Sequence, residues 1–130
     1  MCLRKTHKLP KISEEKIEVY KLLLSTGNDL ITPWRKEQVK DMKLEAAHSY
    51  IDTVDKPTIE GEGVHAYVDY DTAAHDWVHL VMCYRRVGMI PKIYLATIPP
   101  KTPYWEGRRG EIAATELLIE EAMPDPFYIK

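Results

Sequence analysis

The chain is short of cysteine and of long apolar runs. Its 130 residues contain two cysteines, Cys2 and Cys83, which match neither a zinc motif nor a dense disulfide framework, so we expect reduced thiols and a cytoplasmic location. No apolar run approaches the roughly 20 residues that a membrane helix requires, and the basic N-terminus lacks the apolar segment of a signal peptide. We therefore expect no membrane partner.

Strong charge of one sign and the common catalytic motifs are also missing. The 18 Lys and Arg residues nearly balance the 20 Asp and Glu residues, whereas a nucleic-acid-binding domain normally carries a basic face, so no nucleic-acid partner is expected. The six glycines form no Gly-x-Ser-x-Gly elbow and no phosphate-binding loop, which disfavours common hydrolases and nucleotide triphosphatases. These absences favour a protein that acts without turnover, and they leave any catalytic residues unknown.

Strand patterns, by contrast, are frequent. β-Branched and aromatic residues alternate with polar ones between turn-forming clusters, which is typical of half-buried strands. The expected strands are 18–24 and 30–34, joined as a hairpin within 17–35, followed by 64–69 and 92–98. The other segments are an extended lead-in over 1–13, a short helix or loop over 36–60, a proline-punctuated loop over 99–110 and a helix or strand over 111–123.

One amphipathic helix is expected at 72–87, where Asp71 supplies an N-cap and Gly88 a C-terminal stop. Together with the strands, this helix predicts a single α+β domain over 1–130. In that fold, a small, twisted, mainly antiparallel sheet carries the helix on one face. The side chains expected in the core are Trp77, Val78, Val81, Tyr84, Val19, Leu23, Ile93 and Leu95.

Asp71, His75 and His79 recur at intervals of four residues along this helix. Two histidines one turn apart can hold zinc when both imidazoles lie on one side. Both histidines project away from the apolar stripe, however, so a metal site would need ligands folded over an exposed face. We interpret them as surface histidines and expect no metal.

The first strand carries a lysine in an apolar pattern. Lys21 shares a face with Val19 and Leu23, and Tyr20 lies on the opposite face. A lysine on an apolar face either extends its ammonium group to water at the end of the strand or binds an anion in a cleft. Tyr20 and Lys21 are therefore candidates for a ligand-binding site.

Two further pairs of side chains are candidates because of their positions in the chain. His65 and Tyr67 share one face of the strand 64–69, an alternation that a half-exposed sheet also produces. Tyr104 and Trp105 lie in the segment 99–110, where they form either the rim of a ligand site or the cover of a small core. The charged residues beside this aromatic pair are Glu106, Arg108 and Arg109.

The opening segments at 1–6, 16–24 and 30–34, with the late segment 98–119, resemble a family of short uncharacterised proteins of gut bacteria and their phages. In that family the late segment has a Pro-Lys-Gly-Thr turn, an aromatic pair and a Glu-Gly step. Here no glycine separates Lys101 from Thr102. The resemblance implies a phage or mobile-element origin and no particular reaction.

A second resemblance is to the ADP-ribosyltransferase fold. It is carried by the aromatic–basic pair Tyr20–Lys21, by the strand and helix in 63–77, and by a glutamate near the C-terminus, Glu111 or Glu116. In such enzymes the basic or histidine residue positions NAD, and the glutamate orients the ribose in an oxocarbenium-like transition state. The chain departs from that pattern because it has neither the Ser-Thr-Ser motif nor the Gln/Glu-x-Glu motif.

Three hypotheses for function follow. The first is a small phage-type accessory protein that binds a host protein or a small nucleotide-like ligand without turnover and without a cofactor. The second is an ADP-ribosyltransferase-like enzyme that uses NAD, and the third is a structural or virion-associated protein. The sequence leaves open whether the protein forms homo-oligomers. The ligand-binding candidates are Tyr20, Lys21, His65, Tyr67, Tyr104, Trp105 and Glu111.

Overall fold

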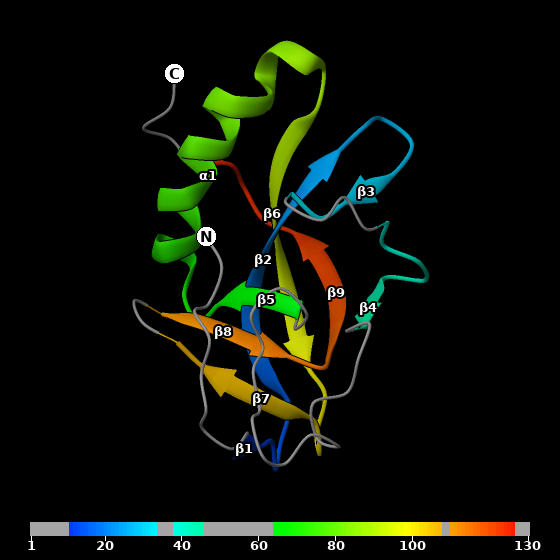
Figure 1. The fold of residues 1–130 in the computed structure, drawn as a ribbon, viewed down its shortest axis with the longest axis vertical. Helices are drawn as coiled ribbons and strands as arrows, with labels where there is room; N and C mark the ends of the chain where they lie inside the picture. The colour runs from blue at the N-terminus through cyan, green and yellow to red at the C-terminus, as the bar shows by residue number, and fades with distance from the viewer. Residues whose placement is uncertain (1–10, 34–37, 46–63, 108–109, 127–130) are drawn as a thin grey trace, which may run out of the picture.

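The computed structural model describes residues 11–33, 38–45, 64–107 and 110–126 (Figure 1). Its elements are β1 (Lys11–Ile12), β2 (Ile17–Ser25), β3 (Leu30–Ile31), β4 (Lys43–Glu45), β5 (Val64–Tyr67), α1 (Tyr70–Tyr84), the 3-10 helix η2 (Arg85–Val87), β6 (Ile90–Ile98), β7 (Pro103–Glu106), β8 (Glu111–Ala114) and β9 (Glu116–Ala122). All the named strand pairs are antiparallel, which confirms the expected α+β class. None of the helices in the described ranges is long and apolar enough to cross a membrane.

The longest pairing in the sheet joins β2 to β6. Every residue of β2 has a partner in β6, from Ile17 with Ile98 to Ser25 with Ile90. The strand order is β1-β7-β8-β5-β2-β6-β9-β4, and β3 pairs with the end of β2. The expected strands at 18–24 and 92–98 and the hairpin through β3 are therefore confirmed. The strand expected at 30–34 is limited to Leu30–Ile31, and the strand expected at 64–69 ends at Tyr67.

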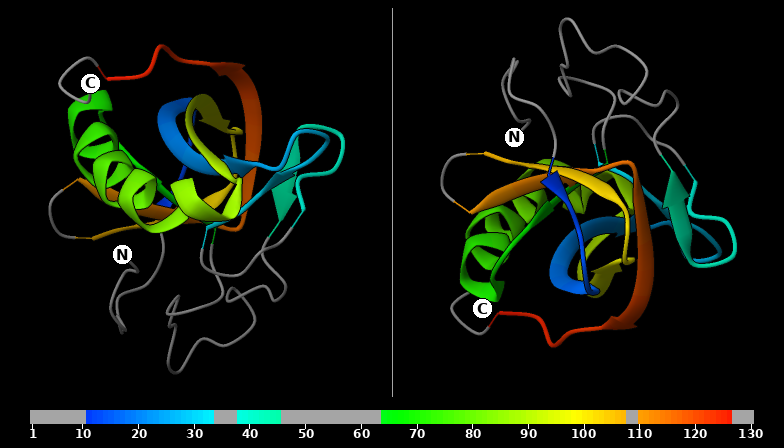
Figure 2. Two further views of the ribbon diagram at one scale, coloured as in Figure 1. Left: turned by 90° about the horizontal axis from the view of Figure 1, so that it is seen from above. Right: turned by 90° about the horizontal axis from the view of Figure 1, so that it is seen from below.

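The sheet curls around a core on one of its faces. β8 and β9 are separated along the chain by Thr115 alone, yet β5, β2 and β6 lie between them in the strand order. A single residue bridges these strands only because the sheet bends strongly, and Figure 2 shows β9 turned across the end of β8. The buried side chains inside the curl are Val19, Leu23, Leu44, Val64, Ala66, Ala96, Ile98, Ile112, Ala114, Leu117 and Ile119.

The helix covers the other face of the sheet. β5 and β6 both run antiparallel to β2, which lies between them, so they are parallel to each other and α1 is the crossover that joins them. The indole Nε1 of Trp77 donates a hydrogen bond to the Pro91 carbonyl oxygen at 2.9 Å, which ties the helix to the start of β6. The buried side chains of this second core are Leu22, Tyr67, Ala73, Ala74, Trp77, Leu80 and Ile93.

The start of the helix differs from the prediction. The helix begins at Tyr70, and the N-cap is Asp69, because Asp69 Oδ1 accepts a hydrogen bond from the backbone N–H of Thr72 at 2.8 Å. Asp71 lies within the first turn. Gly88 ends the helical segment as expected, with a φ of 78°, a left-handed conformation that glycine adopts without steric cost.

The proline-punctuated loop expected over 99–110 contains a strand, so that prediction is wrong in its middle. β7 begins at Pro103, where the missing N–H is tolerated at a strand's first residue, and it pairs with both β1 and β8. Trp105 pairs with Ala113 and is 2% exposed. The small alanine leaves room for the indole, and the two aromatic residues of the strand have high strand propensity.

Two other segments also became strands. Of the two alternatives left open for 111–123, the strand is the one formed, as β8 and β9, although alanine and glutamate favour helices. The described part of 36–60 contains β4, which pairs with β9, and most of that segment lies outside the described residues. Long-range pairing overrides local propensity in each case.

The predicted core is confirmed in part. Val19, Leu23, Trp77 and Ile93 are buried. The other four predicted core residues, Val78, Val81, Tyr84 and Leu95, are half-buried. On the helix, Ala73, Ala74 and Leu80 are buried beside Trp77, and Val78, Val81 and Tyr84 pack at the margin of the same core.

A serine joins the start of the described chain to the turn before β7. Ser13 is 3% exposed, and its hydroxyl donates to the Pro99 carbonyl oxygen at 2.6 Å and accepts from the Thr102 N–H at 2.9 Å. Its backbone carbonyl also accepts from the N–H of Lys101 at 2.6 Å. The side chain thus satisfies the half-buried Pro99 carbonyl and the buried Thr102 N–H at once.

Replacing this hydroxyl should be costly. We expect Ser13→Ala to lower the free energy of unfolding by about 1–3 kcal/mol, because a half-buried carbonyl and a buried N–H lose their partner. Thr26→Ala is the matched control, since its hydroxyl bonds in an exposed turn where water takes over, and it should cost within about 0.5 kcal/mol. Urea unfolding measures both, and equal losses would contradict the prediction.

Candidate functional site

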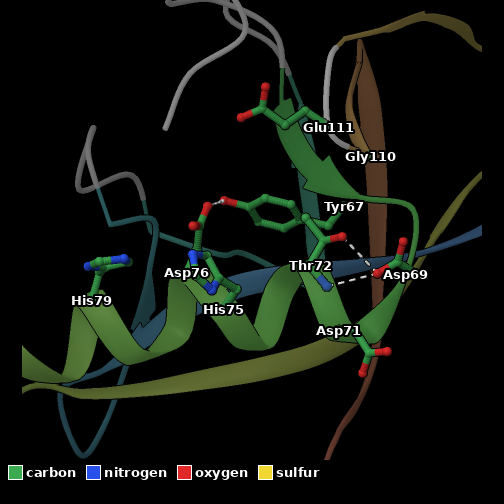
Figure 3. Close-up of a pocket in the computed structure, with 9 residues that line it drawn as sticks. All are labelled: Tyr67, Asp69, Asp71, Thr72, His75, Asp76, His79, Gly110 and Glu111. Carbon is green, nitrogen blue, oxygen red and sulfur yellow. Dashed lines mark hydrogen bonds between the residues drawn. The ribbon is translucent and has the colours of Figure 1, made fainter.

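A cleft of about 650 Å³ lies between one flank of α1 and the strands β5 and β8 (Figure 3). It exists because α1 packs on β6, β2 and β5, while β8 starts one strand further along the sheet. We call it the α1–β8 cleft. Its described lining consists of Tyr67, Asp69, Asp71, Thr72, His75, Asp76, His79, Gly110 and Glu111.

The floor of the cleft is tied to its helical wall by Tyr67. The ring is 5% exposed and belongs to the core beneath α1, and its hydroxyl donates to Asp76 Oδ2 at 2.5 Å. Figure 3 shows these two side chains pointing toward each other from β5 and α1. A buried ring therefore holds one carboxylate oxygen of Asp76 in place at the cleft.

The cap of α1 forms the end of the cleft. Asp69 Oδ1 accepts hydrogen bonds from the backbone N–H and the hydroxyl of Thr72, both at 2.8 Å. These bonds favour the ionised carboxylate, and the backbone bond has the larger effect, so the pKa of Asp69 lies below its ordinary value. The start of β8 approaches the same point, because the Val68 N–H donates to the Gly110 carbonyl oxygen at 2.8 Å.

The outer edge of the cleft carries two histidines. His75 and His79 are exposed and come from successive turns of α1, and their ring centroids lie 5.5 Å apart with the rings inclined at 77°. The lining includes four carboxylate side chains and, within the described residues, no lysine or arginine. Arg108 and Arg109, which precede Gly110 in the chain, lie outside the described residues. The described wall is therefore acidic.

A second depression, of about 730 Å³, lies along the neighbouring flank of α1. Its wall is mostly apolar and includes Tyr70, Ala74 and Met123. The hydroxyl of Tyr70 donates to the Pro124 carbonyl oxygen at 2.7 Å, which holds the segment after β9 against the helix. Asp71 and His75 form the ridge between this depression and the α1–β8 cleft, because they line both.

Two of the seven candidate residues predicted from the sequence line the cleft. Tyr67 and Glu111 are cross-strand partners, so their side chains share one face of the sheet. His65 lies on the same face one pleat further along β5 and pairs with Ala113. Tyr20 lies beneath the helix, where its ring meets that of Tyr70 edge to face at a centroid distance of 6.0 Å.

The remaining candidates lie elsewhere. Lys21 is 6% exposed on the face opposite Tyr20, and its Nζ donates to the His65 carbonyl oxygen at 2.6 Å. Tyr104 is half-buried against the core inside the curl, and the burial of Trp105 fits the core-covering alternative rather than an exposed rim. Glu116 forms an ion pair with Lys43 at 3.2 Å on β9.

Four residues of the cleft, Asp69, Thr72, Asp76 and Gly110, were not predicted to belong to a site. Asp76 lies on α1 without a motif, and Asp69 and Gly110 come together only through the pairing of β5 with β8. Asp71, His75 and His79 were recognised as a repeating set and interpreted as solvated. Their spacing along the helix was the signal in the sequence that pointed toward this cleft.

No family model, curated protein or solved structure matches the chain. The site is therefore interpreted from its own geometry.

Gly110 is required where β8 passes the helix cap. Its φ is 75°, and a Cβ there would lie 3.3 Å from both Thr72 Oγ1 and Val68 Cγ2. Gly88 has a similar φ of 78° with nothing within 4 Å of the added atom. We expect Gly88→Ala to cost about 1–2 kcal/mol from backbone strain and Gly110→Ala to cost more, because it adds the contacts. Chemical denaturation of the pair tests this, and equal costs would show that the approach is not tight.

Asp69 should make stability depend on pH. Folding lowers the pKa of Asp69 from its ordinary value of 3.8. The ionised carboxylate therefore contributes fully to the free energy of unfolding above pH 3.8, and this contribution is lost as the pH falls through the lower pKa of the folded state. At pH 7 we expect Asp69→Ala to cost about 1 kcal/mol, and the difference from the parent protein should shrink in acid. Asp71→Ala is the control and should cost less, since Asp69 and not Asp71 accepts the cap hydrogen bonds from Thr72 and the helix dipole contributes only a few tenths of a kcal/mol to about 1 kcal/mol at an exposed position. Urea melts from pH 7 to pH 3 measure both, and a larger loss for Asp71→Ala would contradict the assignment of the cap.

Proposed function

We propose that the protein acts by binding, without turnover, and that the α1–β8 cleft receives a positively charged group of its ligand. The observation that carries this proposal is the carboxylate of Asp76, which is half-buried and held by the hydroxyl of Tyr67 at 2.5 Å. A fixed carboxylate in a partly enclosed cleft attracts a cation more strongly than a carboxylate on an open surface does.

The neighbouring charges support the same sign of ligand. Asp69 and Asp71 line the same cleft as Asp76, so a phosphate group would meet repulsion from the described wall, whereas an ammonium or guanidinium group would be attracted. Charge-assisted hydrogen bonds from such groups to carboxylates are among the stronger ones in proteins. The expected nucleotide-like ligand is therefore less well suited to this wall than an amine.

An alkylammonium or guanidinium group has two sources. It is either part of a small free amine or the side chain of a lysine or arginine on a partner protein, and the second source fits the expectation of a host-protein partner. The phage origin rests on the sequence resemblance alone and stays a prediction. So does the NAD-dependent alternative. Glu111 lines the cleft, but Lys21, the basic residue of that resemblance, is not among the described lining residues, so we base the proposal on binding.

Ligand titration tests the proposal with three arms. Spermidine represents a free amine, a lysine- and arginine-containing peptide represents a partner protein, and NAD represents a nucleotide. We expect a cationic ligand to bind and raise the melting temperature, by several degrees at a hundred times its Kd, with affinity that falls as salt is added. Whichever of spermidine and the peptide binds more tightly identifies the source of the cation.

Matched charge removals locate the site. Asp76→Asn keeps an acceptor for the Tyr67 hydroxyl and should weaken binding by about tenfold or more, because a charge-assisted bond is lost. Glu120→Gln removes the same charge from an exposed position on β9 and should leave the affinity nearly unchanged. Binding of NAD alone, or equal effects of the two substitutions, would overturn the proposal.

A further inference from the structure

The edge of the cleft holds two imidazoles at a defined spacing. The ring centroids of His75 and His79 are 5.5 Å apart, and Figure 3 shows the two rings side by side along α1. When two imidazoles bind one tetrahedral ion through nitrogens at about 2.0–2.1 Å, their centroids lie roughly 5 Å apart. The spacing of the two rings is therefore close to the spacing that a shared metal ion requires.

We propose that His75 and His79 form a two-histidine site for a divalent transition-metal ion such as Zn²⁺, with water in the remaining positions. Imidazole nitrogen suits zinc, nickel and copper, whereas calcium and magnesium prefer oxygen ligands. Within the described ranges, no set of three or more His, Cys, Asp or Glu side chains can hold a metal ion. The site thus has two protein ligands and open positions that face solvent.

The helix fixes the backbone of both ligands. Trp77 and Leu80, which alternate with the histidines along α1, are each 5% exposed in the core beneath it, and the Trp77 indole is bonded to the Pro91 carbonyl oxygen at 2.9 Å. Metal binding therefore has to order only two exposed side chains and no backbone. This lowers the entropy cost of forming the site.

The surrounding carboxylates assist without being ligands. Asp71 and Asp76 line the same cleft as the histidines, so their charges raise the local concentration of cations. A metal-bound imidazole commonly donates its second N–H to a carboxylate, which holds the ring in position. The sequence-based objection, that ligands must fold over the exposed face from elsewhere, does not apply to a site completed by water.

A competing pair exists one turn further along. Cys83 is a free, exposed cysteine four residues after His79, so His79 and Cys83 have the same spacing as the two histidines. The ring geometry favours the histidine pair. The two pairs share His79 and differ in the other ligand, which makes them separable by substitution.

Calorimetric titration of the full chain with ZnCl₂ tests the inference. We expect one ion per chain, bound roughly a hundredfold or more weakly in His75→Asn and in His79→Asn, because each loses the local concentration effect of the second imidazole. Both histidines are exposed, so the variants should keep their fold, which circular dichroism verifies. The titration contains no amine, so its result is independent of the proposed cationic ligand.

Cys83→Ser is the matched control and should retain zinc binding. Loss of binding in Cys83→Ser with retention in His75→Asn would overturn the inference by assigning the ion to the His79–Cys83 pair. Absence of zinc binding by the parent protein, or unchanged binding in both histidine variants, would overturn it as well.

Discussion

The pairing of β2 with β6 along the whole length of both strands is the constraint on which the rest of the structure depends. β2 lies in the middle of the sheet and is buried on both faces, with Val19 and Leu23 in the core inside the curl and Leu22 in the core beneath α1. Burial of both faces requires a cover on each side. The curled sheet provides one cover, and the crossover helix between β5 and β6 provides the other.

The α1–β8 cleft is a consequence of that arrangement. The crossover helix lies over β5, β2 and β6, so the sheet continues past the edge of the helix into β8. The strand pair Tyr67 and Glu111 stands at this step, and the flank of α1 faces it. The cleft therefore arises mainly because the sheet is wider than the helix, so that β8 lies beside α1.

Tyr67 links the stability of the fold to the chemistry of the cleft. Its ring belongs to the core beneath α1, and its hydroxyl reaches the carboxylate of Asp76. The same side chain therefore contributes apolar burial and holds a charged group in one orientation. Side chains fixed in this way lose little freedom when a ligand binds, which is the usual basis of a preorganised site.

The limits of the sequence-based predictions lie in long-range pairing. The alternation in 64–69 and 92–98 and the stripe of 72–87 predicted three elements correctly, because each pattern is local. The strand β7 and the two strands in 111–123 depend on partners far along the chain. The proline-rich composition of 99–110 therefore pointed to a loop, and the sequence left 111–123 open between helix and strand. For the cleft, Tyr67 and Glu111 were predicted, whereas Asp76 carries no local signal.

The sequence by itself determined which residues alternate, where the helix stops at Gly88, and that Asp71, His75 and His79 share a helical face. Those properties follow from φ/ψ preferences and from the periods of strands and helices. Only the tertiary structure decided that Asp69 caps the helix, that Lys21 is buried away from the cleft, and that Tyr67 meets Asp76. These contacts depend on how the sheet curls and how far the crossover helix extends over it, and neither is encoded in any short stretch of the chain.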